Sequence, residues 1–337
     1  MSNLAYASDK SQAPSLVPLQ ELYQDRMNLV NEKILSSLEC SVPLIQEIAG
    51  YLIRQGGKRL RPLLTLASAD LCGYQGQDHI GLAAAVEFIH TATLLHDDVV
   101  DESALRRGVA TANTVWDNTA SVLVGDFLFS RAFQLMVDQG SLQTLKVLSD
   151  ASARIAEGEV MQLASSRNIH LTEYQYLEVI GAKTACLFQA ATHVGGLVAG
   201  ASESQVKAIK NFGFYLGVAF QLTDDALDYS STKEALGKSI GDDFAEGKVT
   251  LPIIFAYQNG SQAQQALIKK CFADLAHDAG DLEHIIEILN ETKALFMTLE
   301  KAKTYVDHAR NCLESFPESP TKSALAEVLD FVLIRNS

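Results

Sequence analysis

Two groups of aspartates with the same spacing are the residues most suited to chemistry. The first group, DDVVD, runs from Asp97 to Asp101, and the second, DDALD, runs from Asp224 to Asp228. In a helix, residues i and i+4 lie on one face, so the first and last aspartate of each group project together. Carboxylates gathered in this way repel one another unless a cation lies between them, and Mg²⁺ accepts such ligands together with phosphate oxygens.

The residues before both groups are small or apolar, over 91–95 and 218–222, so the aspartates continue buried stretches of helix. A solvated helix face is the alternative interpretation of a single such motif. Burying several carboxylates without partners is costly, however, and two matched groups favour a metal site.

Basic residues occur at two places that suit a phosphorylated ligand. The segment 56–62, GGKRLRP, holds three cations after a glycine pair, and Arg106 and Arg107 follow the first aspartate group. Arginine offers a rigid fork to phosphate oxygens, and glycine lets the backbone approach an anion. Either cluster alone would be ordinary surface charge, but Arg106 and Arg107 are expected at the end of the helix that carries the first aspartate group, beside the proposed metals. Weaker polar candidates are His90, Lys183, Thr184, Gln221, Lys238 and Lys248.

The elements that position these residues are expected to be helices. No proline occurs between Pro62 and Pro252, and this stretch is rich in Ala and Leu. We expect one all-α domain of ten or more helices over 17–337, after a flexible leader at 1–16. The main helices are expected at about 78–102, 119–139, 143–166, 172–200, 203–230, 249–259, 262–275, 281–315 and 321–335.

Composition excludes several classes of protein. The formal net charge of −14 argues against a nucleic-acid binder, which needs a basic face. Five widely spaced cysteines without a CxxC pair argue against a disulfide framework and a zinc-thiolate site. No signal peptide and no membrane-spanning run is evident, so we expect a soluble, cytoplasmic protein that could still touch a membrane surface when it handles a lipid.

Together these elements resemble the trans-isoprenyl diphosphate synthase family, the polyprenyl synthetases. The resemblance covers about residues 20–335 and is closest to bacterial enzymes that make octaprenyl to decaprenyl diphosphate for quinone side chains. The matching stretches are GGKRLRP at 56–62, LLHDDVVDESALRRG at 94–108, GDFLFSRAF at 125–133, KT at 183–184, FQLTDDALDY at 220–229 and GKSIGDDFAEGKVTLP at 237–252. It implies the isoprenoid synthase fold, a helical bundle around a deep central cavity, and a homodimer.

The resemblance also implies a role for each matching residue. An allylic diphosphate would bind between the two motifs through three Mg²⁺ ions, whose ligands would come from Asp97, Asp101, Asp224 and Asp228. The catalytic group would include these motifs with Asp98, Asp225 and Lys183. Isopentenyl diphosphate would be held by Lys58, Arg61, His90 and Arg107. The allylic substrate would be contacted by Arg106, Lys183, Thr184, Gln221 and Lys238.

Product length is expected to depend on the helix that carries the first motif. Ala92 and Thr93 lie about one turn before Asp97, where short-chain members of the family place aromatic rings. Small residues at these positions imply an open tunnel, with Ile89 next along it. Candidate residues for its floor are Leu135, Val147 and Leu148.

Four other functions are compatible with parts of the sequence. A short-chain synthase would share every motif and differ in product. A class I terpene cyclase would lack the second DDxxD and the GGKR segment. A di-iron bundle would need a second pair like Glu87-x-x-His90, and a non-catalytic subunit of a heteromeric synthase would be expected to have lost aspartates.

Overall fold

The computed structural model describes residues 14–54, 57–106, 108–230 and 241–334, and these are predominantly helical. This confirms the expected all-α class. The described elements, in chain order, are α1 (Val17–Leu22), α2 (Gln24–Ser37), α3 (Pro43–Arg54), α4 (Leu60–Leu71), α5 (Asp78–Val100), β1 (Leu105–Arg106), β2 (Val109–Ala110), α6 (Ala112–Val115), α7 (Asn118–Gln139), α8 (Leu142–Ser165), α9 (Glu173–Ile180), η1 (Gly181–Ala185), α10 (Cys186–Val198), α11 (Glu203–Ser230), α12 (Asp242–Ala245), α13 (Leu251–Asn259), α14 (Gln262–Phe272), α15 (Asp281–Glu291), α16 (Ala294–Leu313) and α17 (Pro320–Ile334).

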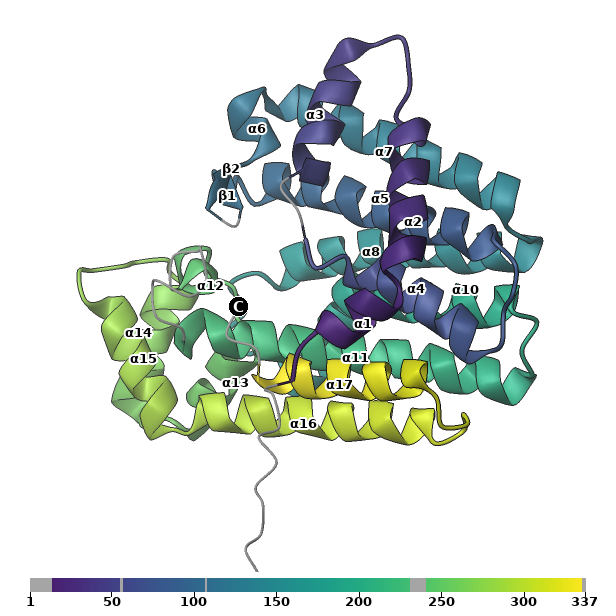
Figure 1. Cartoon of the computed structure of the whole chain (residues 1–337). Helices are drawn as coiled ribbons and strands as arrows, with labels where there is room; N and C mark the ends of the chain where they lie inside the picture. The colour runs from purple at the N-terminus through teal and green to yellow at the C-terminus, as the bar shows by residue number, and fades with distance from the viewer. Residues whose placement is uncertain (1–13, 55–56, 107, 231–240, 335–337) are drawn as a thin grey trace, which may run out of the picture.

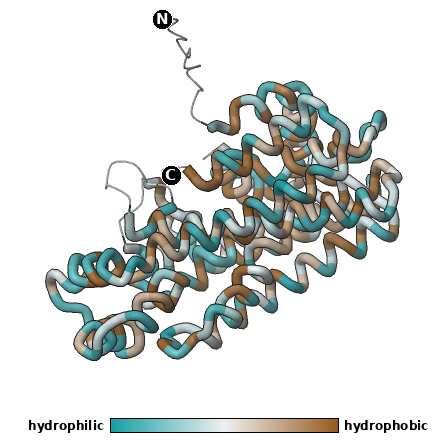
Figure 2. The backbone as a smooth tube through the Cα atoms, turned by 90° about the horizontal axis from the view of Figure 1, so that it is seen from below, coloured by the Kyte–Doolittle hydropathy of each residue, from teal (hydrophilic) through white to brown (hydrophobic). Residues whose placement is uncertain are grey.

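The two helices that carry the aspartate motifs, α5 and α11, lie inside the bundle. Helix α5 packs most extensively against α7, and α11 packs against α10 on one side and α16 on the other. Figure 1 shows α16 and α17 running alongside α11, with α14 and α15 gathered at one end. In Figure 2, apolar and polar segments alternate along most helices, as expected of helices that bury one face.

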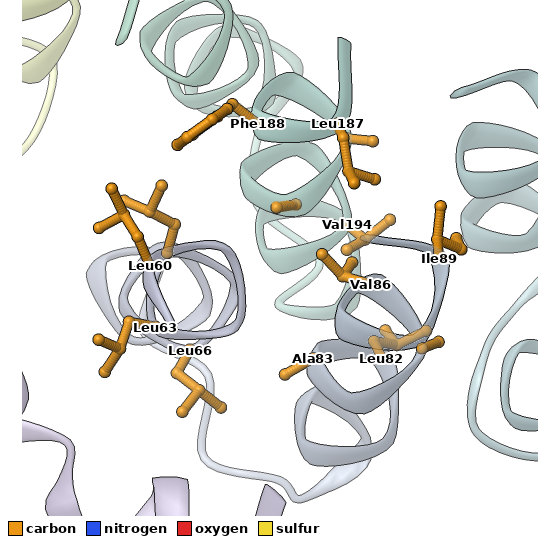
Figure 3. Close-up of a cluster of buried hydrophobic side chains, with 14 of the residues drawn as sticks. Leu60, Leu63, Leu66, Leu82, Ala83, Val86, Ile89, Leu187, Phe188 and Val194 are labelled. Atoms are coloured by element: carbon orange, nitrogen blue, oxygen red, sulfur yellow. The ribbon is translucent and has the colours of Figure 1, made fainter. Parts of the chain in front are cut away.

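A continuous apolar core joins the first-motif helix to its neighbours. Three elements contribute the side chains labelled in Figure 3, which are Leu60, Leu63 and Leu66 of α4, Leu82, Ala83, Val86 and Ile89 of α5, and Leu187, Phe188 and Val194 of α10. Close contact between helices in this region depends on small residues. A Cβ on Gly217 of α11 would lie 2.7 Å from the Cα of Ala185, so the two backbones could not approach so closely with any other residue.

Two expected helices are interrupted. The segment 172–200 consists of α9, a π-helical turn η1 and α10, and 281–315 consists of α15 and α16. Lys293 separates the latter two with a left-handed backbone (φ 59°), although it is not a glycine. Apolar periodicity continues across both interruptions, so the sequence pattern does not reveal them. Of the expected leader, residues 1–13 lie outside the described residues, and Leu16 is already buried.

One described helix, α7, is long and apolar enough to cross a membrane by length and composition. It packs along its length against α5 and contributes buried residues such as Leu128 and Leu135 to the core. A core helix of a globular protein passes the same test, so this observation does not indicate a membrane span.

Candidate active site

The first aspartate motif lies at the C-terminal end of α5. Helix α5 ends at Val100, Asp101 is its C-cap residue, and Asp97 is half-buried. Burial raises the pKa of the Asp97 carboxyl to about 7; Glu159 and Asp101 add to the rise, and the positive charges of Lys183 and Arg106 oppose it. The carboxylate therefore lies where its own charge is unfavourable, and a bound cation would relieve that cost.

Asp98 has a different environment from its neighbour. Its side chain is 1% exposed, and its Oδ1 accepts hydrogen bonds from Nε (2.9 Å) and Nη2 (2.7 Å) of Arg106. Arg106 lies in β1 of a short hairpin whose turn includes Gly108 (φ 76°), and not at the end of the motif helix as the sequence interpretation had it. Asp98 thus anchors the arginine that we expected to contact a diphosphate.

A lysine joins the first motif to the segment after the second. Nζ of Lys248 lies 3.3 Å from Oδ2 of Asp101 and also contacts Glu246. Burial opposes the charged form of Lys248, but the surrounding carboxylates of Asp101, Asp243 and Glu246 outweigh it and raise its pKa. Because Asp243 donates its backbone N–H to Asp228 Oδ2 (3.1 Å), the end of the second motif is tied to the same segment.

The second motif places its three aspartates in different surroundings on α11. Asp224 is exposed and Asp228 is half-buried, whereas Asp225 is 3% exposed. Asp225 accepts hydrogen bonds from Nε2 of Gln221 (2.8 Å) and from the hydroxyl of Tyr176. Asp224 and Asp228 are therefore the members of this motif with access to a ligand.

The π-helical turn η1 presents Lys183 and Thr184 to the same region. Nζ of Lys183 lies 2.7 Å from Oε2 of Glu159 on α8, and the Thr184 hydroxyl donates to Oε1 of Gln221 (2.9 Å). The turn fits closely against α8, because a Cβ on Gly158 would lie 2.5 Å from the backbone nitrogen of Lys183. π-helical turns are often found at functional sites.

The predicted basic group surrounds the start of α4. Nη1 of Arg61 lies 3.2 Å from Nε2 of His90, and its guanidinium carbon lies 4.3 Å from the centre of the Phe188 ring. Nζ of Lys58 lies 4.9 Å from the centre of the Phe331 ring, on the last helix. His90 therefore contacts the basic group. Arg107 and Lys238 lie outside the described residues.

Glu87, which suggested half of a di-iron ligand set, is an ion-pair partner. Its Oε1 lies 2.8 Å from Nη1 of Arg59, a residue with a left-handed backbone (φ 48°) just before α4. This pair links α5 to the segment that carries Lys58 and Arg61. The structure gives Glu87 a positional role beside the basic group.

The candidate chain-length residues belong to the core around α5. Ala92 and Ile89 are fully buried, as is Leu148, whereas Thr93 is half-buried and its hydroxyl donates to the carbonyl of His90 (2.8 Å). Leu135 is also buried, and Val147 is partly buried against the same core. Apart from Thr93, these side chains lie in one apolar cluster, and the proposed part of all six in setting product length stays a prediction.

Three contacting residues escaped the sequence interpretation or were only weakly indicated by it. Glu159 and Tyr176 are separated from their partners by 24 and 49 residues, and Lys248 is separated from Asp101 by 147. Helical periodicity relates residues within a few turns of each other, so it carries no signal for pairs at these separations.

The oxygen donors fit Mg²⁺ bound together with a diphosphate. Among the described residues, no group of three or more His, Cys, Asp or Glu side chains is gathered closely enough to hold a metal alone. Mg²⁺ keeps several waters and takes one or two carboxylates plus phosphate oxygens. The donors that each motif presents, Asp97 with Asp101 and Asp224 with Asp228, match that requirement.

Comparison with known proteins gives one consistent result. A family model described as polyprenyl synthetase matches residues 42–289. The octaprenyl diphosphate synthase of Haemophilus influenzae is 44% identical over 327 residues, which covers 97% of this chain and 99% of that protein.

Solved structures agree with these matches. A decaprenyl diphosphate synthase from Rhodobacter capsulatus has a TM-score of 0.91 and 47% identity, covering 95% of this chain and 98% of that one. A polyprenyl synthase from Caulobacter crescentus CB15, complexed with calcium and isoprenyl diphosphate, has a TM-score of 0.94 and 44% identity, covering 97% and 99%. With its all-α fold, its paired aspartate motifs and these relatives, the chain belongs to the polyprenyl synthetase family of prenyltransferases.

Proposed function

We propose that this enzyme adds isopentenyl diphosphate units to an allylic diphosphate such as farnesyl diphosphate and makes an all-trans product of octaprenyl to decaprenyl length for quinone side chains. The observation that carries the long product is the small side chain of Ala92, about one turn before Asp97 on α5. The names of the relatives, octaprenyl and decaprenyl diphosphate synthases, support the same length.

The allylic diphosphate is assigned to the space between the two motifs. Three Mg²⁺ ions, held by Asp97, Asp101, Asp224 and Asp228, would supply the positive charge that stabilises the departing diphosphate. Arg106, fixed by its two hydrogen bonds to Asp98, adds a preorganised cation to the same diphosphate. Lys183 approaches from η1, and Lys238 is assigned to this diphosphate by the family resemblance.

Isopentenyl diphosphate is assigned to the basic group. Lys58, Arg61 and His90 would hold its diphosphate, with Arg107 added by resemblance. The contact between Arg61 and His90 brings the donors from α4 and α5 to one place. Holding this substrate still beside the allylic carbon converts a bimolecular step into an effectively unimolecular one.

Chain growth follows from ionisation of the allylic substrate. When its C–O bond breaks, the carbon end becomes an allylic cation, and the π electrons of isopentenyl diphosphate form the new C–C bond. Loss of one proton, taken up by the released diphosphate, then restores a double bond. The hydroxyl oxygen of Thr184, the amide oxygen of Gln221 and the backbone carbonyl of Lys183 supply dipoles that stabilise the cation while water is excluded.

We also propose that a second copy of the chain covers the outer face of α7. This face exposes Val122, Leu123, Phe133 and Val137 at helical spacing, although the opposite face of the helix is buried against α5. A stripe of this kind on a helix that is already part of the core suits a helix–helix interface between protomers. We assign the protein to the cytoplasm, with peripheral membrane contact at product release.

An assay of the purified chain alone tests the proposal. The protein is incubated with Mg²⁺, farnesyl diphosphate and radiolabelled isopentenyl diphosphate, and the dephosphorylated products are sized by reversed-phase thin-layer chromatography. We expect products of eight to ten isoprene units that disappear when the metal is chelated. Products of four units or fewer would identify a short-chain synthase, and activity only after a second protein is added would identify a subunit of a heteromeric enzyme.

A further inference from the structure

A chain of hydrogen bonds leads from the core to the proposed cation site. It starts at Tyr176 on α9, passes through Asp225 and Gln221 on α11 and ends at Thr184 in η1. Tyr176 and Asp225 are 4% and 3% exposed, whereas Gln221 and Thr184 are only half-buried. The buried end therefore lies away from substrate, and the accessible end carries the two oxygens assigned to the allylic cation.

The chemistry of Asp225 fixes the direction of every bond in this chain. Its two carboxyl oxygens accept from Tyr176 and from the NH₂ group of Gln221 (2.8 Å), so the Gln221 amide turns its nitrogen toward Asp225. The amide oxygen of Gln221 then faces Thr184 and accepts the proton of its hydroxyl (2.9 Å). With that proton engaged, the lone pairs of Thr184 Oγ1 remain available to an electron-poor carbon.

We propose, on the basis of the proposed function, that Tyr176 is a positioning residue for the ionisation step. Its hydroxyl donates to Oδ2 of Asp225 and holds the carboxylate so that Oδ1 meets the amide of Gln221. Tyr176 thereby selects one of the two orientations of that amide and, through it, the orientation of the Thr184 hydroxyl. The residue lies on a different helix from both aspartate motifs and reaches the reacting atoms only through these partners.

The substitution Tyr176→Phe removes the hydroxyl and keeps the ring. We expect kcat at saturating substrates to fall roughly tenfold, in line with the loss of one hydrogen bond to a charged group. The KM for isopentenyl diphosphate and the Mg²⁺ concentration at half-maximal rate should stay within about twofold, because Tyr176 donates to Asp225, which is assigned neither to isopentenyl diphosphate nor to a metal ion. Tyr174→Phe is the matched control, since Tyr174 is 72% exposed on the same helix, and it should behave as the unsubstituted enzyme.

A double-mutant cycle separates positioning from a general loss of structure. Thr184→Val should also lower kcat, and adding Tyr176→Phe to it should cost little more, since both changes break one chain. Thr184→Ser, which keeps the hydroxyl, should restore most of the rate and should again respond to Tyr176→Phe. Rates are divided by the folded fraction measured by circular dichroism, so that a loss of stability is not counted as a loss of catalysis.

Any one of three results would overturn the assignment of Tyr176. The first is an unchanged kcat in Tyr176→Phe, and the second is fully additive effects of Tyr176→Phe and Thr184→Val on kcat. The third is a rise in the KM for isopentenyl diphosphate in Tyr176→Phe that is as large as the fall in kcat. Failure of the unsubstituted enzyme to elongate farnesyl diphosphate in the same assay would instead refute the proposed function.

Discussion

The carboxyl of Asp97 should destabilise the metal-free protein at neutral pH, so replacing it should make that protein more stable. The side chain is half-buried near Glu159 and Asp101, and burial raises its pKa from 3.8 to about 7. The folded state therefore binds a proton more tightly than the unfolded state. The contribution of Asp97 to the free energy of unfolding is therefore most favourable below pH 4, where its carboxyl is protonated in both states, and this contribution declines as the pH rises toward 7. Asp97→Asn is neutral at every pH and escapes this decline.

The size of the effect follows from the two pKa values. Their difference corresponds to about 4 kcal/mol, at about 1.4 kcal/mol per pH unit. The partial exposure of the carboxylate reduces this to about 2 kcal/mol. With an unfolding entropy of about 2.1 cal/mol/K per residue, a chain of 337 residues should show a rise in Tm of about 3 °C above pH 7.

Thermal unfolding in the presence of a chelator measures this difference from pH 4 to 8. Asp98→Asn is the matched control on the adjacent residue. Because Asp98 is buried and holds Arg106, its substitution should lower the free energy of unfolding by about 3 kcal/mol at neutral pH. Adding Mg²⁺ with diphosphate should reverse the order, stabilising the unsubstituted protein more than Asp97→Asn.

A Tm of Asp97→Asn that is equal to or below that of the unsubstituted protein at pH 8 would refute this reasoning. So would a difference in Tm that does not shrink between pH 7 and pH 4. Either result would mean that the Asp97 carboxylate is already compensated before any metal binds.

Three further substitutions test separate parts of the site. Ala92→Phe should shorten the product to about C15–C20, since one ring fills a cavity one turn deep; an unchanged product on reversed-phase thin-layer chromatography contradicts the tunnel. Glu159→Gln weakens the 2.7 Å pair with Lys183 and should raise the KM for farnesyl diphosphate roughly tenfold; an unchanged KM in steady-state kinetics removes the pair from that site. Leu123→Arg should convert a dimer to a monomer in sedimentation velocity, because it places a charge on the exposed stripe of α7; a protein that remains a dimer places the interface elsewhere.

Local patterns in the sequence were sufficient to predict the two helices that carry the aspartate motifs. Helix α11 spans 203–230 as expected, and α5 begins at Asp78 and ends two residues before its expected boundary. Both helices are long, apolar and free of proline, so local preference and burial favour the same conformation. The assignment of the motif residues to one site came from type and spacing, since each motif is contained in little more than one turn.

Features that depend on contacts between distant parts of the chain could not be predicted from local sequence patterns. The π-helical turn at Gly181–Ala185 adds no proline or unusual composition, yet it sets the direction of Lys183 and Thr184. Arg106 was expected at the end of the motif helix. It lies instead in the β1–β2 hairpin, where its guanidinium contacts the carboxylate of Asp98. Contacts of this kind depend on which helices become neighbours, and periodicity within a helix carries no information about that choice.

The contact between Lys58 and Phe331 has a consequence for the order in which the enzyme becomes competent during synthesis. Lys58 precedes both aspartate motifs in the chain, whereas Phe331 follows both and lies 273 residues after Lys58. Both helices that carry the aspartate motifs are therefore synthesised before the basic group at the start of α4 gains its contact with α17. The contact of Lys58 with α17 thus forms only after α17 itself has been synthesised, so changes in α17 should act first on the basic group around α4.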